Sequence, residues 1–225
     1  LTDLMSAAKS GNADSVKVLL EAGEEVNARD DFGMTALMWA VAAGRADIAA
    51  MLLEAGARVD EQNNSGYTAL IHAADLNRPE VLKTLLEAGA NPQIKNSLGF
   101  TALRYAVSRG NTGIVESLVG AGTDLKAGEY SGILVQPAYK GYSEIVRLLL
   151  AAGADVNARD TADEYQATAL MRASMAGHTA IVKILLEAGA EVNAEDIDGD
   201  RALKYARLGG HPEIAELLVM AGALE

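Results

Sequence analysis

Few side chains in this sequence could do chemistry, and their spacing does not assemble a reactive site. The chain has three histidines, His72, His178 and His211, and no cysteine. His178 and His211 each follow a glycine at which a helix is expected to end, so we interpret both as structural. His72 has no second histidine nearby with which to share a metal ion. Without cysteine there are no disulfides, no thiolate catalysis and no Cys-ligated zinc. We therefore expect no metal and no cofactor.

Other reactive patterns are also missing. Gly120-Ala121-Gly122 lacks the further glycine or lysine of a phosphate loop, and it closes a helix rather than opening one. Serine, histidine and aspartate occur, but no spacing links them into a triad. Several glutamates recur at regular intervals along the sequence, at Glu21, Glu54, Glu87 and Glu187. We interpret them as a solvated outer face and not as acid–base pairs. The sequence predicts a protein that is not an enzyme.

Composition narrows the class of partner. The chain has 225 residues and a net charge of −12, which disfavours a nucleic-acid backbone or an anionic membrane as partner. The uncharged stretch around Trp39, from Met34 to Gly44, is too short to span a bilayer. We therefore expect no nucleic acid and no membrane as partner. The lack of cysteine does not fix the compartment: we expect the cytoplasm, and a bacterial periplasm stays open.

An internal repeat determines the architecture. Thr-Ala-Leu begins at Thr35, Thr68 and Thr101, with steps of 33 residues (68 − 35 and 101 − 68), and again at Thr168. The interval before Thr168 leaves room for one irregular unit centred on Gly132. This predicts one domain over residues 1–225 with seven repeats, at about 1–29, 30–62, 63–95, 96–126, 127–159, 160–195 and 196–225.

Each repeat is predicted to form two helices and a turn. The first helix starts at the threonine, whose hydroxyl can cap free backbone N–H groups. It ends at a glycine or asparagine, the residues that best adopt a left-handed terminus, at Gly11, Gly44, Asn77, Gly110, Gly141, Gly177 and Gly210. The second helix has apolar residues at i, i+1, i+4 and i+5, for example Val81, Leu82, Leu85 and Leu86. The fold class is therefore all-α.

These motifs resemble the ankyrin repeat family over the whole chain. The residues that carry the resemblance are Gly66-Tyr67-Thr68-Ala69-Leu70-Ile71, Leu185-Leu186-Glu187-Ala188-Gly189-Ala190 and Val26-Asn27-Ala28. Alanine replaces the family's proline after the threonine, and the signature histidine is missing. The resemblance implies an ankyrin-repeat α-solenoid of helix-turn-helix units joined by β-hairpin-like fingers. It also implies a non-catalytic module, expected to be a monomer, that binds a partner protein through a concave face of fingers and first helices.

The aromatic residues avoid the apolar stripe of the second helices. Eight of the ten lie in turns or at one equivalent position of the first helices. The resemblance assigns both places to the concave face, and aromatic residues are enriched at interface hot spots. Arginines there would meet partner carboxylates. The expected partner-binding residues are Phe32, Met34, Trp39, Tyr67, His72, Phe100, Arg104, Tyr105, Arg109, Tyr130, Tyr139, Tyr165 and Arg172. Two alternatives stay open. The side chains at the Trp39 position pack between first helices with only their edges exposed, and the aromatic residues of the two irregular fingers, Tyr130 and Tyr165, reflect neutral drift.

The fifth repeat breaks the pattern. Gly132 replaces the capping threonine, and Pro137 stands where the other repeats have alanine. Because proline removes a helical hydrogen bond, we expect this helix to start late or to kink. Extra residues lie between Asp160 and Ala167. We expect the segment between Gly128 and Tyr142 to open first, and hydrogen exchange would detect that opening.

The two ends of the repeat array should be polar. Ser15 stands in an otherwise apolar second-helix column, and the last repeat has a basic stripe of Arg201, Lys204 and Arg207. We interpret the stripe as a solubilising cap, with phosphate binding as the alternative. The chain could also be a regulatory part of a larger enzyme, channel or effector. An engineered scaffold is disfavoured by the irregular fifth repeat.

Overall fold

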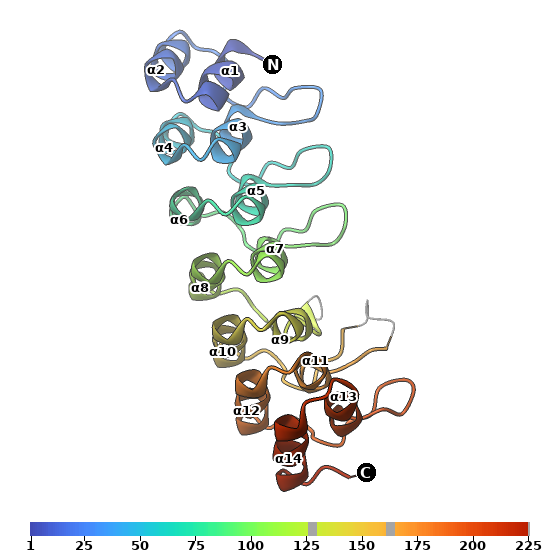
Figure 1. Cartoon of the computed structure of the whole chain (residues 1–225). Coiled ribbons are helices and arrows are strands. Elements are labelled where there is room, and N and C mark those ends of the chain that lie inside the picture. Colours follow the sequence, from blue (N-terminus) through green and yellow to red (C-terminus); the bar gives the residue numbers. More distant parts are fainter. Residues whose placement is uncertain (126–129, 161–164, 225) are drawn as a thin grey trace. The chain divides into compact units, whose positions relative to one another are not determined.

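The computed structural model describes residues 1–125, 130–160 and 165–224. The chain divides into two compact units, residues 1–123 (the N-terminal unit) and 124–225 (the C-terminal unit). Helices follow one another in pairs in each unit (Figure 1). The N-terminal unit has α1 (Asp3–Ser10), α2 (Ala13–Glu21), α3 (Ala36–Ala42), α4 (Ala46–Glu54), α5 (Ala69–Asp75), α6 (Pro79–Glu87), α7 (Ala102–Arg109) and α8 (Thr112–Gly120). The C-terminal unit has α9 (Val135–Lys140), α10 (Ser143–Ala151), α11 (Ala169–Ala176), α12 (Thr179–Glu187), α13 (Ala202–Leu208) and α14 (Pro212–Met220).

The first helix of most pairs begins and ends as the sequence predicts. A threonine hydroxyl accepts a hydrogen bond from the backbone N–H three residues on, at Thr2, Thr35, Thr68, Thr101 and Thr168. Such a cap contributes about 1 kcal/mol to the free energy of unfolding. At the other end, Gly11 and Gly177 adopt the left-handed conformation, and Asn77 adopts it with a φ of 52°. The all-α helix-pair architecture is confirmed.

The second helices bury a narrower stripe than predicted. In α6, Val81, Leu82 and Leu85 are fully buried, whereas Leu86, at the predicted fourth apolar position, is half-buried. The same positions are buried in α12, at Ile181, Val182 and Leu185. Burying a leucine or isoleucine side chain contributes about 1.5–3 kcal/mol, so this stripe adds several kcal/mol of packing energy in α6 and α12.

Polar side chains at several repeat junctions tie a helix pair to the previous one. The Nε2 of His178 donates to the Tyr139 carbonyl oxygen (2.9 Å), and that of His211 donates to the Met175 carbonyl oxygen (3.2 Å). In the N-terminal unit, Arg78 donates in the same way to the Ala42 carbonyl oxygen (3.2 Å). These bonds satisfy carbonyls at helix ends that have no partner within the helix. His178 and His211 are therefore structural, as interpreted from the sequence.

The helix of the fifth repeat starts late, as expected. α9 has six residues and begins at Val135, and turns cover 131–134 before it. Pro137 thus falls in the first turn, where its missing N–H breaks no helical bond. Gly132 has a φ of 70°, and a Cβ there would lie 2.4 Å from the Asp160 Cα, so only glycine fits. Gly128, where the predicted early opening begins, lies outside the described residues.

Candidate functional site

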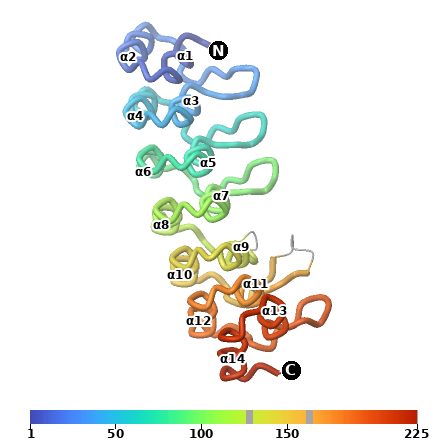
Figure 2. Tube along the Cα trace, in the orientation of Figure 1, coloured from blue at the N-terminus to red at the C-terminus, as the bar shows by residue number. Residues whose placement is uncertain are grey.

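Tight fingers precede the first helices. In the N-terminal unit these loops project on the side of α3, α5 and α7 (Figure 2). Each is closed by an Asp or Asn whose Oδ1 accepts the backbone N–H groups two and four residues on. Asp30 accepts from Phe32 and Met34, both at 2.9 Å. The residue at the equivalent position closes the other described fingers of this type in the same way, at Asn63, Asn96 and Asp196.

The first-helix column that contains Trp39 holds these fingers in place. Trp39 Nε1 donates to the Oδ2 of Asp30 (3.0 Å), and the Tyr205 hydroxyl donates to the Oδ2 of Asp196 (2.5 Å). Where an asparagine closes the finger, its Nδ2 makes the contact with the first helix. Asn96 Nδ2 donates to the Tyr105 hydroxyl (2.9 Å), and Asn63 Nδ2 lies 3.4 Å from His72 Nε2. Each finger is thereby fixed to its own helix.

The rings in the N-terminal unit also contact one another. The Tyr67 ring lies 4.9 Å from the His72 ring and 5.5 Å from the Tyr105 ring, measured between centroids. The hydroxyls of Tyr67 and Tyr105 share a hydrogen bond, and Phe100 packs edge-on against Tyr105 at 5.8 Å. Such pairs each contribute about 0.5–1.5 kcal/mol beyond their burial. Tyr67, His72, Phe100 and Tyr105 form one cluster, which we call the ring cluster.

Burial and hydrogen bonding shift the pKa values here. Burial, with the Tyr105 hydrogen bond, raises the pKa of Tyr67 to about 12. Burial lowers the pKa of His72, and the nearby Asp75 carboxylate opposes it only in part. For Asp30, burial alone would raise the pKa, but hydrogen bonds from Met34, Trp39 and Phe32 outweigh it and lower the pKa. At neutral pH His72 is therefore uncharged, and Asp30 is an anion held by donors.

Successive fingers are hydrogen-bonded to each other through their backbones. Asn64 N–H donates to the Phe32 carbonyl oxygen (3.1 Å), and Ser97 N–H donates to the Ser65 carbonyl oxygen (3.0 Å). The next finger passes so close that a Cβ on Gly66 would lie 2.6 Å from the Ser97 backbone nitrogen. The fingers of the N-terminal unit therefore form a rigid ladder.

The predicted residues of the N-terminal unit differ in exposure. Phe32 is 72% exposed and Phe100 is 42% exposed. Trp39, Tyr67, His72, Arg104 and Tyr105 are half-buried, and Lys9 Nζ lies 4.3 Å from the Trp39 ring centroid. Arg109 is exposed but paired with Asp75 at 2.7 Å. Met34 is only 7% exposed, so its side chain packs under the finger and does not face a partner.

In the C-terminal unit, two of the four predicted residues are exposed, and Arg172 is half-buried. Tyr139 is 51% exposed and Tyr165 is 40% exposed. The Arg172 guanidinium lies 5.7 Å from the Tyr165 ring centroid, within cation–π range. Tyr130 is 2% exposed, which corrects the expectation that it contacts a partner: in the irregular turn before α9 its side chain faces the core.

The described residues offer no metal site: no three His, Asp or Glu side chains among them converge to hold an ion. Likewise, within the described part of the chain, every helix is too short or too polar to cross a membrane.

Comparison with known proteins identifies the family. A family model for ankyrin repeats, in three copies, matches residues 4–96, 91–160 and 134–224. The chain belongs to the ankyrin repeat family. The ankyrin repeat domain of Bcl-3, described as a unique member of the IkappaB protein family, is similar, with a TM-score of 0.83, 27% identity and coverage of 97% of this chain and 98% of that one. The human ASB11 ankyrin repeat domain is similar in fold, with a TM-score of 0.80, 24% identity and full coverage of both chains. No curated protein sequence matches the chain significantly.

Sequence reasoning missed several exposed apolar residues of these ankyrin repeats, because it searched for aromatic rings and arginines. Leu98 and Ile197 lie in fingers and are 70% and 57% exposed. Met175 and Leu208, at the ends of α11 and α13, are 41% and 71% exposed. The repeat register could have identified Leu98, because it follows Asn96 by two residues, just as Phe32 follows Asp30.

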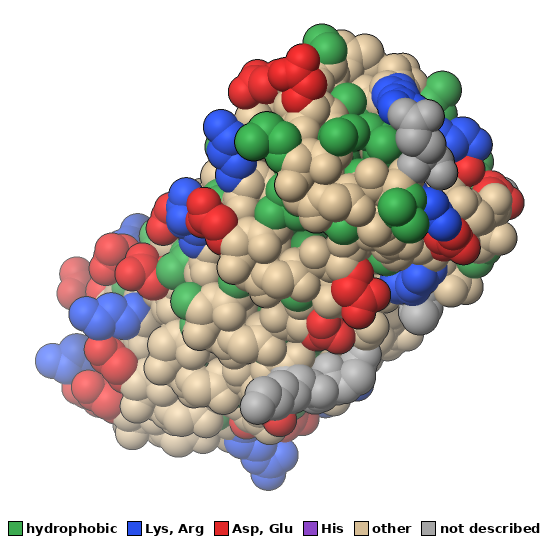
Figure 3. Space-filling model, turned by 90° about the horizontal axis from the view of Figure 1, so that it is seen from below, with side chains coloured by type: hydrophobic (Ala, Val, Ile, Leu, Met, Phe, Trp, Pro, Cys, Tyr) green, Lys and Arg blue, Asp and Glu red, His purple; other side chains and the backbone are tan. Residues whose placement is uncertain are grey.

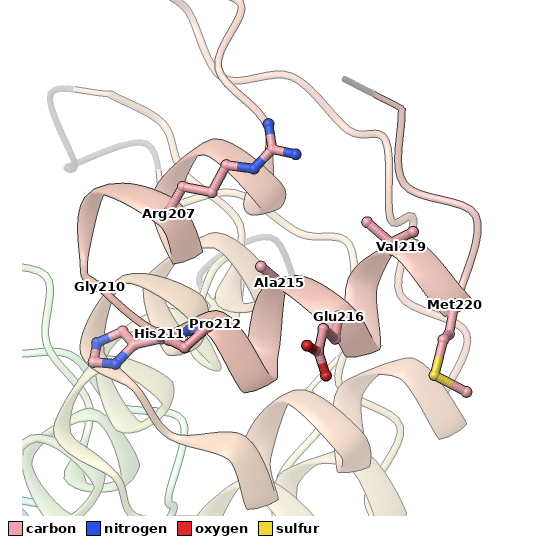
Figure 4. A pocket seen from close by; sticks show the side chains of 8 residues that line it. All are labelled: Arg207, Gly210, His211, Pro212, Ala215, Glu216, Val219 and Met220. Carbon is pink, nitrogen blue, oxygen red and sulfur yellow. The ribbon is translucent and has the colours of Figure 1, made fainter.

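The end of the last repeat is less polar than predicted. A hollow of about 710 Å³ lies between the end of α13 and the side of α14, lined by Arg207, Gly210, His211, Pro212, Ala215, Glu216, Val219 and Met220 (Figure 4). Met220 is 85% exposed and Val219 is 53% exposed. In Figure 3, which views the chain from below, hydrophobic side chains gather between acidic and basic ones. Lys204 and Arg201 pair with Asp200 and Glu195, which weakens the phosphate-binding alternative.

Proposed function

We propose that this chain is a non-catalytic interaction module that binds a partner protein through its fingers and first helices. Ankyrin repeat domains are protein-interaction modules in general. The observation that supports this face is the combination of rigid fingers with exposed rings: Phe32 is 72% exposed on a finger that Asp30 and the backbone of Asn64 hold in place.

Rigidity matters because binding costs free energy whenever it orders a mobile surface. A large ring on a preorganised turn buries much apolar area at a small entropic cost. Phe32 and Phe100 meet both conditions in the N-terminal unit. We propose them as the main apolar contacts there.

The half-buried rings have a different role in this proposal. Trp39, His72 and Tyr105 contact the finger residues Asp30, Asn63 and Asn96, so they position the fingers and show a partner only their edges. Arg109, which is exposed, and Arg172, which is half-buried, supply charge. The protein would act as a monomer.

The test is capture of partners from an extract of the source organism by the immobilised chain, read by mass spectrometry. Phe32→Ala combined with Phe100→Ala should reduce recovery of a true partner at least about tenfold, since hot-spot truncation costs 2 kcal/mol or more. Val18→Ala is the matched control, because Val18 is 62% exposed but lies on the second helix α2. Equal recovery by the double variant, or loss with Val18→Ala, would place the site elsewhere.

A further inference from the structure

The C-terminal unit presents a row of exposed apolar side chains on its first helices. Tyr139, Met175 and Leu208 each stand two residues before a left-handed glycine at the end of the first helix, and they are 51%, 41% and 71% exposed. We call these three residues the apolar stripe. In the N-terminal unit the same position is occupied by small or polar residues, at Lys9, Ala42, Asp75 and Ser108.

Stacking keeps the apolar stripe in register. α9 packs against α11, and α11 packs against α13. The imidazoles of His178 and His211 bond the backbone carbonyls of Tyr139 and Met175, so these two residues occupy equivalent places in consecutive repeats. Packed helices lie about 8–10 Å apart, so the three side chains recur at roughly that interval.

The charge beside the stripe is opposite to that of the whole chain. α9, α11 and α13 contain Lys140, Arg172, Lys204 and Arg207 and no carboxylate, in a chain with a net charge of −12. Lys204 is paired with Asp200, which precedes α13. Lys140 follows Tyr139 directly, Arg207 precedes Leu208, and Arg172 Nη1 lies 3.9 Å from Met175 Sδ. Cations thus flank every member of the stripe.

We propose that the apolar stripe docks an acidic amphipathic α-helix of a partner protein. Seven residues of α-helix rise about 10.5 Å, so apolar residues at i, i+7 and i+14 match the spacing of the stripe. Acidic residues beside them would face Lys140, Arg172 and Arg207. An extended strand fits less well, because residues three apart point to opposite faces. The inference rests on the proposed function in placing the partner on the first helices, and it adds the partner's chemistry.

The probe is a fluorescent peptide of about 18 residues, with leucine at every seventh position, glutamate beside each leucine and alanine elsewhere. Fluorescence anisotropy with the full chain should show saturable binding that weakens with added salt. Met175→Ser combined with Leu208→Ser should weaken binding at least about tenfold, and lysine in place of glutamate in the peptide should do the same. Val219→Ser combined with Met220→Ser, exposed apolar positions on the second helix α14, is the matched control and should change nothing.

Several results would overturn the inference: no binding of the acidic peptide, equal binding of the lysine peptide, or an unchanged affinity of the Met175 and Leu208 double variant. Sedimentation showing self-association that this double variant abolishes would assign the stripe to a second copy instead. Capture that depends on Phe32 and Phe100 while the peptide fails would refute the inference and leave the proposed function standing. Circular dichroism checks that each variant is folded.

Discussion

The two units use one scaffold to present different surfaces. In the N-terminal unit the fingers carry the exposed apolar residues Phe32, Leu98 and Phe100, while Lys9 and Asp75 stand at the stripe position. In the C-terminal unit the first helices carry the apolar stripe and the cations. The bond between finger and helix occurs in both units, as in Asp30–Trp39 and Asp196–Tyr205. A few positions of the repeat thus determine which side chains each repeat presents to a partner. The remaining positions maintain the same packing between repeats.

The largest expected effect comes from a substitution that disrupts the hydrogen-bonded ladder of fingers in the N-terminal unit. Gly66→Ala should lower the free energy of unfolding by about 3 kcal/mol or more, because alanine is strained at a φ of 77° and its Cβ would meet the Ser97 backbone. Gly89→Ala, at a φ of 82° with open space around it, should cost only about 1–2 kcal/mol. Urea unfolding measures both, and equal losses would contradict the ladder.

The finger–helix bond should be worth more where it involves a buried carboxylate. Tyr205→Phe removes the donor to Asp196, a residue only 7% exposed, and should cost about 1.5–3 kcal/mol. Tyr105→Phe removes bonds to two neutral groups, the Asn96 amide and the Tyr67 hydroxyl, and should cost about 1–2 kcal/mol. Tyr139→Phe, which changes a hydroxyl on an exposed ring, should be nearly neutral. Thermal unfolding ranks the three, and the reverse order would show that charge does not set the bond strength.

The irregular repeat should open before its neighbours. α9 has six residues and no side-chain cap, whereas α7 has eight residues and is capped by Thr101. Amides in 135–142 should therefore exchange about tenfold faster than those of α7, equivalent to about 1.4 kcal/mol of opening free energy. Hydrogen exchange read by mass spectrometry tests this, and uniform protection of the two helices would refute it.

The smallest expected effect is a pH dependence confined to the N-terminal unit. Burial lowers the pKa of His72 below its ordinary 6.5, so the unfolded chain binds the proton more readily than the folded one. The contribution of His72 to the free energy of unfolding has its full value above pH 6.5. It declines as the pH falls below 6.5, by less than about 1 kcal/mol near pH 6. Urea midpoints of the chain and of His72→Gln across this range test the account. An identical decline in both would exclude His72 as the cause.

The sequence predicts the helix pairs because their signals are local. A threonine, a glycine and an apolar period fix where each helix begins, ends and packs, and Asn77 and the late start of α9 follow from backbone chemistry. The exposure of individual site residues is not local. Met34 and Tyr67 hold the same finger position, yet Met34 packs inward while Tyr67 bonds Tyr105 of the next repeat. Tyr130 is buried by a turn whose path the repeat pattern does not specify.

The central claim is that partners contact the fingers and first helices. Site-specific photo-crosslinking tests it most directly, with a photoreactive amino acid placed in turn at Phe32, Tyr139, Val18 and Val219, all exposed. Partner adducts are expected from Phe32 or Tyr139, on a finger and a first helix, and none from Val18 or Val219, on second helices. Adducts that form only from Val18 or Val219 would contradict it.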